Sequence, residues 1–222
     1  MLPRLLPRTP LFALLLASCA SGPGLEEDPI RSEEMVAWIE RVHVEADRAR
    51  LSIGESFERL NALAAGRFGK ESAATSFAKF VQSIDVADQQ ARRFRECVRP
   101  MQDAAKPVFE RWHKSLATIA NDRLRQRGEL RYSVAKERYD AIAKVAVPAQ
   151  DEFDKYVKAL RDHAAFLAND LNAGSIDDIQ DEVKLVARSA RELDRSMESC
   201  LAAARAYVEQ STLPAAPPAQ TR

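Results

Sequence analysis

Apolar residues return at alternating steps of three and four through four long segments of this 222-residue chain. The first run covers residues 35–63 and is broken only by Ser56. The other three runs cover residues 77–119, 132–167 and 176–207. A heptad sustained in this way is typical of helices that wind around one another in a left-handed sense. The pattern therefore predicts an all-α fold.

The lengths of these segments predict an elongated molecule. At 1.5 Å of rise per residue, the middle two helices would be roughly 75 Å long and the outer two about 55 Å. Short connections make sequential helices antiparallel. We therefore expect an elongated antiparallel helical bundle, or coiled coil, of four long helices with an up-down-up-down course. The hairpin near Asn121 should extend beyond the outer helices.

Turn and cap residues mark the junctions between the helices. Gly66 and Gly69 bracket the first turn, and either Asn121 or Gly128 marks the second junction. At the third junction, Asn172 and Gly174 can end the third helix. The last helix would then open with a capping box in which Ser175 is followed three residues later by Asp178.

Proline inside a helix removes a hydrogen bond and costs about 3 kcal/mol unless the helix kinks. Three prolines fall near the middle of the predicted rod: Pro100, Pro107 and Pro148. We expect a bend there, or a break in the second helix.

The first eighteen residues have the features of an export signal. Arg4 and Arg8 precede an apolar run over residues 11–17, which is too short to span a bilayer. The small Ser18 stands directly before Cys19. This arrangement resembles a bacterial lipoprotein signal. The resemblance implies that Cys19 is acylated, typically with palmitate, and becomes the first residue of the mature protein.

The same resemblance predicts where the protein is anchored. Residue 20 is Ala, not the Asp that lipoproteins retained in the inner membrane tend to carry. We therefore expect a lipid anchor in the outer membrane, with the protein facing the periplasm. Because the first helix would start part-way along the rod, the anchor would hold the molecule near its waist, and either end could face the membrane. The expected divisions are a signal peptide (1–18), a lipidated flexible linker (19–29), a helical bundle (30–211) and a disordered tail rich in Pro and Ala (212–222).

Two Glu-x-x-His pairs are candidate metal ligands. Glu40 with His43 and Glu110 with His113 have the spacing found in di-iron bundles. The heptad register argues against such a site, since Glu110 and His113 fall beside or opposite the apolar seam. His163 does occupy the seam, where packing is its expected role. No catalytic set, phosphate loop or Cys-x-x-Cys site is recognised, so we expect no enzymatic activity, no metal, no cofactor and no small-molecule substrate.

Cys97 and Cys200 are a candidate disulfide. With Cys19 acylated, two cysteines remain in an oxidising compartment. Both fall at nearly the same distance from the same end of the rod, so the second and fourth helices could bring them together. The alternative is a pair of apolar, unbonded cysteines.

Charge is balanced overall but uneven along the rod. Lys plus Arg equals Asp plus Glu, at 33 each, which gives no reason to expect nucleic-acid binding. Residues 111–138 hold eight basic residues and three acids, whereas residues 162–182 hold six acids and no Lys or Arg. The hairpin would therefore be basic. Either this is an ordinary solvated surface or it meets an anionic partner through Arg123, Arg125, Arg127 and Arg131.

The chain also resembles a known family over roughly Arg41 to Glu209. The residues that carry the likeness are Phe109-Glu110-Arg111-Trp112, Leu124-Arg125, Arg138-Tyr139, Pro148 and Asp170-Leu171-Asn172-Ala173. They resemble a proteobacterial domain-of-unknown-function family of coiled-coil lipoproteins, whose best marker is Leu171-Asn172-Ala173. The resemblance implies a helical, anchored protein and transfers no site residues.

Two functions are compatible with these features. The first is a non-enzymatic envelope scaffold or adaptor, held in the membrane by its lipid and contacting an envelope protein or peptidoglycan. The second is a periplasmic carrier that binds a lipid or another apolar ligand within the bundle. The small seam residues and the interior prolines motivate the carrier.

Overall fold

The computed structural model describes residues 29–211, and these residues form helices without any strand. The all-α class is therefore confirmed. There are five helices rather than four: α1 (Pro29–Ala64), α2 (Ala73–Ala117), α3 (Asp122–Asn169), α4 (Ala173–Asp178) and α5 (Gln180–Ser211). The segment expected to form one last helix is divided into the short α4 and the long α5. Cys19 and residues 212–222 lie outside the described part of the chain.

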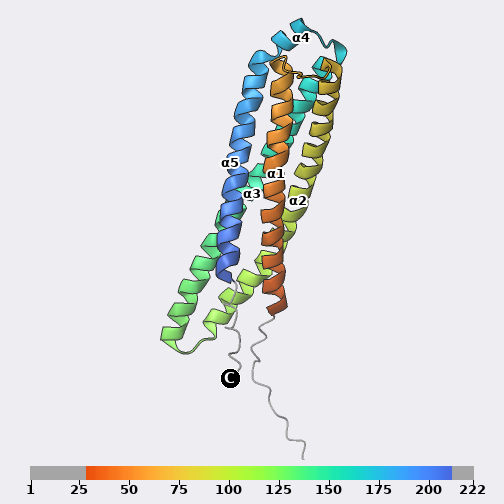
Figure 1. The fold of residues 1–222 in the computed structure, drawn as a ribbon. Coiled ribbons are helices and arrows are strands. Elements are labelled where there is room, and N and C mark those ends of the chain that lie inside the picture. Colours follow the sequence, from red (N-terminus) through yellow and green to blue (C-terminus); the bar gives the residue numbers. More distant parts are fainter. Residues whose placement is uncertain (1–28, 212–222) are drawn as a thin grey trace, which may run out of the picture.

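The four long helices lie side by side in an elongated bundle, with α4 at one end (Figure 1). α1 packs against α2 and α5, and α3 packs against the same two helices. α1 and α3 therefore occupy one diagonal of the bundle, and α2 and α5 occupy the other.

The core consists mainly of the predicted apolar seams. Every apolar residue of the first run is buried, and so is the last run from Ile179, directly before α5, to Tyr207. Large side chains such as Phe80, Phe94 and Phe153 are 0% exposed. Ser56, which interrupts the first apolar run, is also 0% exposed, so the buried side of α1 is continuous at this position.

The first two junctions follow the turn chemistry of the sequence. Gly66 and Gly69 have φ values of 63° and 60°, which favour glycine. Asn121 caps α3, because its Oδ1 accepts a hydrogen bond from the Leu124 backbone N–H at 3.1 Å. Gly128 lies inside α3, where an added Cβ would come within 2.5 Å of the Leu116 side chain. Asn121 is thus the junction, and Gly128 serves the close approach of α2 and α3.

The predicted capping box at the last junction is wrong. Asn172 caps α4 by accepting a hydrogen bond from the Ser175 N–H at 3.0 Å, and Ser175 lies inside α4, buried. The long helix α5 begins only at Gln180, whose Nε2 donates to the Ala64 carbonyl of α1 at 2.6 Å. This bond satisfies a carbonyl at the end of α1, which has no partner within its own helix.

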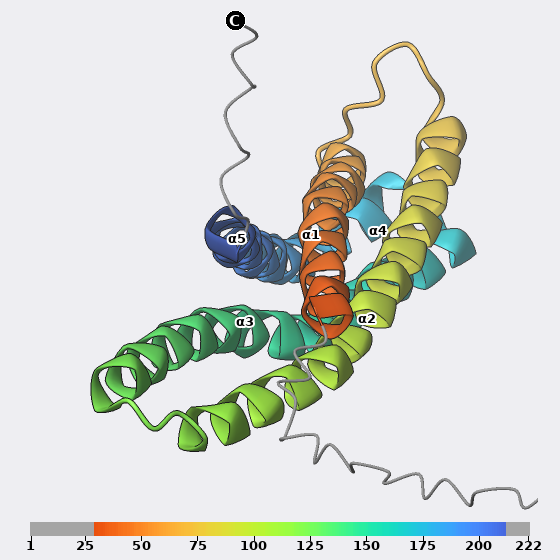
Figure 2. The same ribbon diagram turned by 90° about the horizontal axis from the view of Figure 1, so that it is seen from below.

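The three prolines lie inside helices that continue through them. Pro100 and Pro107 lie within α2 and Pro148 within α3, so the second helix is not broken. Seen from below, the end of the α2–α3 hairpin leans away from α1 and α5 (Figure 2). A lean is the expected response to interior proline, which removes a backbone bond on one side of the helix.

None of the described helices has an apolar stretch long enough to cross a membrane.

Candidate functional site

The hairpin formed by α2 and α3 projects beyond α1 and α5 (Figure 1). Gln90 of α2 donates a hydrogen bond to the Glu45 carbonyl of α1 at 3.1 Å, which fixes the register of the two helices. Counting from Glu45 back to Pro29, the first residue of α1, and the same number of residues forward from Gln90 along α2 leads to Lys106. The start of α1 is therefore level with Lys106 of α2. Because α2 continues to Ala117, the hairpin extends roughly 17 Å past the start of α1. α1 thus begins toward the hairpin end of the rod and not at its waist.

The apolar seam continues into this projection, where two of its four helices are missing. Trp112 and Tyr132 are seam residues, and both are only half-buried there. Their rings contact each other edge to face, with centroids 5.8 Å apart. Phe109 was not predicted in the seam but is 5% exposed, and its ring centroid lies 6.0 Å from Tyr132 and 5.4 Å from Tyr139. These aromatic contacts replace the packing that α1 and α5 supply elsewhere.

An open groove of about 370 Å³ runs beside this aromatic cluster. Lys136 Nζ stands 5.7 Å from the ring centre of Phe109 and 5.9 Å from that of Tyr139, and it also pairs with Asp140. The groove is lined by Gln102, Ala105, Lys106, Phe109, Glu110, His113, Tyr132, Lys136 and Tyr139. It offers an apolar floor with ammonium groups at its rim.

The buried phenols near the groove stay protonated at neutral pH. Burial raises the pKa of Tyr139 to about 12, with Asp140 and Asp103 adding to the effect. Burial likewise raises the pKa of Tyr207 on α5 to about 12, with a further rise from Tyr139 and a reduction from Arg138. Phenols held neutral in this way suit packing and not proton transfer.

The structure separates the four hairpin arginines into two groups. Arg125 is half-buried, pairs with Asp122 and approaches the Ile119 carbonyl, so it holds the loop that joins α2 to α3. Arg123, Arg127 and Arg131 are exposed and make no ion pair within residues 29–211. Only these three are available to an external partner.

Two exposed leucines accompany these arginines, and the sequence interpretation overlooked them. Leu124 and Leu130 are 55% and 66% exposed. Residues three, four or seven apart lie on one side of a helix. Arg127 and Leu130 come four and seven residues after Arg123, and Arg127 and Arg131 come three and seven residues after Leu124. All five side chains therefore lie on one face of α3. We call Arg123, Leu124, Arg127, Leu130 and Arg131 the α3 outer face.

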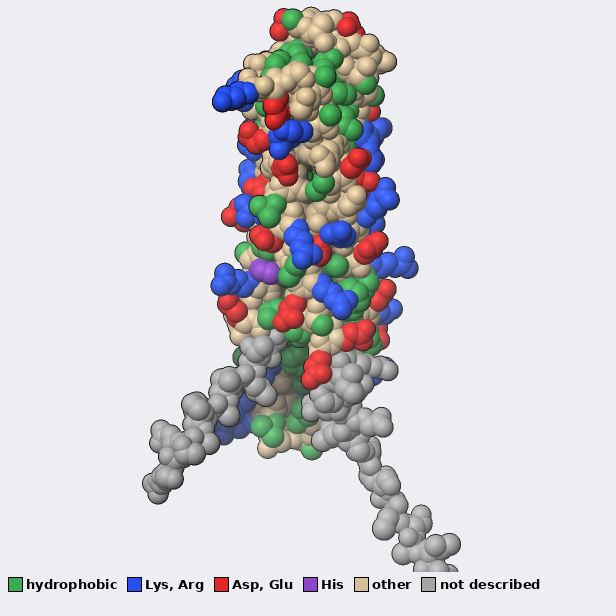
Figure 3. Space-filling view, turned by 45° about the vertical axis from the view of Figure 1, so that its right-hand side comes forward, with side chains coloured by type: hydrophobic (Ala, Val, Ile, Leu, Met, Phe, Trp, Pro, Cys, Tyr) green, Lys and Arg blue, Asp and Glu red, His purple; other side chains and the backbone are tan. Residues whose placement is uncertain are grey.

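The shaft of the rod carries a different kind of surface. On the side displayed in Figure 3, Lys and Arg side chains alternate with Asp and Glu along its length. Ion pairs such as Arg92–Asp88 (2.7 Å) and Arg161–Asp88 (2.9 Å) neutralise many of them locally. Such a surface is typical of a solvated helical rod.

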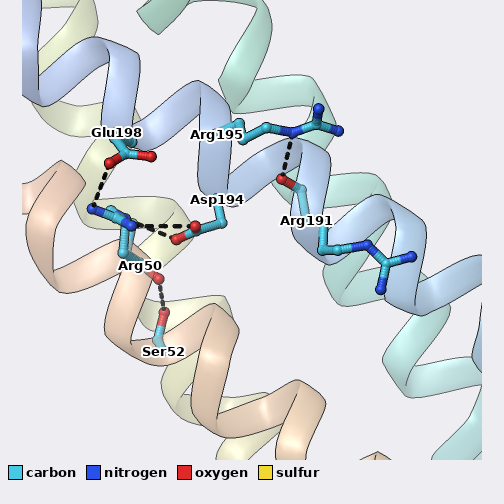
Figure 4. A network of polar contacts seen from close by, with 7 residues as sticks. Arg50, Ser52, Arg191, Asp194, Arg195 and Glu198 are labelled. Atoms are coloured by element: carbon cyan, nitrogen blue, oxygen red, sulfur yellow. Dashed lines mark hydrogen bonds and ion pairs between the residues drawn. The ribbon is translucent and has the colours of Figure 1, made fainter.

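A second groove, of about 580 Å³, lies between α1 and α5. Arg50 of α1 points between Asp194 and Glu198 of α5 (Figure 4). Its Nε is 2.8 Å from Asp194 Oδ1, and its Nη1 is 3.9 Å from Glu198 Oε1. The bond to Asp194 is the main reason that the pKa of Arg50 is raised. The network joins the two helices and resembles no catalytic arrangement.

The two Glu-x-x-His pairs occupy different places. Glu40 is exposed, and His43 lies in the groove between α1 and α5 with its Nδ1 3.3 Å from the Leu201 carbonyl. Glu110 and His113 line the hairpin groove. Within the described residues, no three His, Cys, Asp or Glu side chains gather closely enough to hold a metal ion.

The structure has Cys97 and Cys200 as free thiols, so the predicted disulfide is not formed in it. The two lie at a similar height: Cys97 is near Arg41 and Glu45 of α1, and Leu201, next to Cys200, contacts His43. They belong, however, to α2 and α5, which stand on a diagonal of the bundle and not in the neighbouring positions that the prediction needed. Burial raises the pKa of both thiols, and that of Cys200 to about 12.

His163 is a core residue, as its seam position predicts. It is 9% exposed, and its Nδ1 lies 2.7 Å from the Ala159 carbonyl. Its Nε2 is buried and has no hydrogen-bond partner among the described residues.

Comparison with protein families matches residues 30–211 to the family described as "Protein of unknown function (DUF2959)". Comparison with curated proteins and with solved structures finds no match. The matched range spans all five helices almost completely.

Proposed function

We propose that this chain, which belongs to the DUF2959 family of proteins of unknown function, is a non-enzymatic lipoprotein of the bacterial cell envelope that acts as a scaffold or adaptor. Cys19, in its lipoprotein-like context, would be acylated with palmitate and anchor the protein in the outer membrane, facing the periplasm. An envelope protein or peptidoglycan would be the partner.

The observation that carries this proposal is the projecting hairpin. The shaft of the rod is covered by mixed, locally paired charges, and two of its helices extend past the others. The extension exposes two leucines and three arginines that make no ion pair within residues 29–211. Exposed apolar side chains grouped with charges of one sign are typical of interaction surfaces. The hairpin would be the element through which the rod meets the envelope.

The finer architecture belongs to the same proposal. We take the bundle to be an antiparallel coiled coil of four long helices that run up, down, up and down, with α4 as an added turn at one end. The alternation of three and four in the buried seams supports this view, as does the packing of each long helix against two others.

Anchoring can be tested on the protein made in its native host. Intact-mass analysis of membrane-extracted protein should give a chain that begins at Cys19 and carries acyl groups. The Cys19→Ser variant should lose both the acyl mass and the membrane fraction. The lipoprotein assignment would be refuted by a wild-type chain that keeps residues 1–18, or by one that is found in the membrane fraction no more than the variant.

The groove beside Phe109, Tyr132 and Tyr139 supports a second candidate, a periplasmic carrier for a lipid or another apolar ligand. Native mass spectrometry after gentle extraction distinguishes the two functions. A stoichiometric co-purifying lipid favours the carrier, whereas a protein bound in fixed ratio favours the scaffold. Phe109→Ala should release the lipid in the first case and leave the protein complex unchanged in the second.

A further inference from the structure

We propose that the α3 outer face lies on the anionic phospholipid surface of the membrane that holds the lipid anchor, so that the rod stands with its hairpin end against that membrane. This inference rests on the proposed lipoprotein function. It adds the orientation of the rod and the chemical class of surface that the hairpin contacts.

The composition of the face matches an anionic lipid surface. Its three arginines are exposed and unpaired within residues 29–211, and Leu130 is 66% exposed between them. Basic side chains interspersed with leucines suit a membrane interface, where the guanidinium groups contact phosphates and the leucines enter the headgroup region. The acids of this segment, Asp122 and Glu129, lie about 100° or more around the helix from Arg123.

Geometry allows the anchor and this face to reach one membrane. α1 begins at the same end of the bundle as the hairpin (Figure 1). The hairpin extends roughly 17 Å past Pro29. The ten residues from Cys19 to Pro29 can span up to roughly 35 Å. An acyl chain in the bilayer is therefore compatible with α3 lying on its surface.

The opposite end of the rod is more acidic than the hairpin. Residues 162–182 carry six acids and no Lys or Arg, and this segment forms the end of α3, the whole of α4 and the first turn of α5. Exposed Arg67 and Lys70 of the α1–α2 connection lie at this end too, but the six acids outnumber them, so an anionic membrane would attract this end less than the hairpin. The difference in charge between the two ends thus favours the orientation with the hairpin toward the membrane.

A photo-crosslinking residue can report which end touches lipid. Full-length protein carrying benzoylphenylalanine at Leu130 is reconstituted into vesicles of phosphatidylethanolamine and phosphatidylglycerol, and a second sample carries it at Leu185 of α5. Leu185 is a matched site, because it is 55% exposed and lies toward the α4 end. Irradiation should give phospholipid adducts at Leu130 and few at Leu185. Phosphatidylcholine vesicles should give a much lower yield at Leu130.

Charge removal separates a specific contact from simple proximity. Each basic residue near an anionic surface contributes about fivefold to binding, so Arg123→Ser, Arg127→Ser and Arg131→Ser together should lower the Leu130 adduct yield by at least about tenfold. The control is Arg188→Ser, Arg191→Ser and Arg195→Ser on α5, three exposed arginines that also make no ion pair in the described chain. This control should leave the yield unchanged.

Three outcomes would overturn the inference. They are phospholipid adducts mainly at Leu185, an equal loss of Leu130 adduct yield in both triple variants, or protein that floats with the vesicles in a density gradient without forming adducts at Leu130. In the third case the lipoprotein function survives and only the orientation fails. If the protein does not float and Cys19 carries no acyl group, the proposed function itself fails. Circular dichroism confirms that each variant keeps its helix content.

Discussion

The hydroxyl of Ser56 on α1 lies 2.9 Å from the phenol oxygen of Tyr156 on α3, across the diagonal of the bundle. Both side chains are 0% exposed. The Tyr156 O–H donates to the Ile53 carbonyl at 3.0 Å, and the single Ser56 proton is shared between the Tyr156 oxygen and the Ser52 carbonyl at 2.8 Å. The two hydroxyls are therefore satisfied together, which explains why a serine interrupts an otherwise apolar seam.

Tyr156→Phe should lower the free energy of unfolding by about 1 kcal/mol, because it removes a buried hydrogen bond and keeps the ring. Urea denaturation followed by circular dichroism measures the change. Tyr132→Phe is the matched control: the Tyr132 hydroxyl makes no hydrogen bond within residues 29–211, and its loss should have little effect. In a double-mutant cycle with Ser56→Ala, the two changes should be non-additive by at least about 0.5 kcal/mol. Strict additivity would show that the two hydroxyls do not interact.

His163→Leu should stabilise the protein by about 1 kcal/mol. A buried polar atom without a partner costs about 1–3 kcal/mol, and leucine removes the orphaned Nε2. The Ala159 carbonyl loses its side-chain partner but keeps the backbone bond expected of an α-helix. The measurement is the midpoint of urea unfolding, compared with His43→Leu, which changes a half-buried histidine. A clear loss of stability in His163→Leu would mean that Nε2 has a partner in solution, such as a buried water.

Stability should fall at alkaline pH. Burial raises the pKa of Tyr139, Tyr156 and Tyr207 to about 12, from 10.0. The folded state therefore holds protons that the unfolded chain releases first. The stability that these phenols contribute is complete below pH 10.0 and is lost as the pH rises toward about 12. Phenolate absorbance recorded with helix content should show these phenols ionising together with unfolding. Their ionisation near pH 10 in an intact bundle would contradict the burial.

Cys97 and Cys200 should both titrate as free thiols in protein denatured without reductant. In the native protein, a thiol reagent at pH 8 should modify Cys97 slowly and Cys200 only after unfolding. Cys97 is half-buried, whereas Cys200 is 0% exposed, and burial raises its pKa to about 12. Peptide mass mapping identifies the site. A non-reduced peptide pair that joins the two cysteines would show that the bundle brings α2 and α5 together.

Asn172→Ala should cost about 1 kcal/mol of stability, because the Asn172 side chain caps α4. Asn172→Asp keeps an oxygen acceptor and should retain most of the stability. Thermal unfolding of the two variants measures the difference. Equal melting temperatures would mean that the cap contributes nothing, and the Leu171-Asn172-Ala173 marker would then need another explanation.

The heptads determined most of the fold. Apolar residues that recur every 3.5 positions can be buried only along helix seams, so the burial of Ile39, Phe94, Phe153 and Met197 followed from their spacing. The projecting hairpin also followed, since the second and third runs are longer than the others. Local turn chemistry was less decisive, because Asn121 and Gly128 both carry turn signals and only one of them lies at a junction.

Tertiary structure decided what the spacing left open. Sequence alone places Ser56 in a seam, but only the diagonal position of α3 brings Tyr156 to it. Sequence alone marks Arg123, Arg125, Arg127 and Arg131 as basic. The structure shows that Arg125 holds the loop, whereas the other three are exposed and make no ion pair within residues 29–211. The end of the rod at which α1 begins depends on the register with α2. Periodicity specifies which side of a helix is buried, whereas the identity of its partner depends on how all the helices pack together.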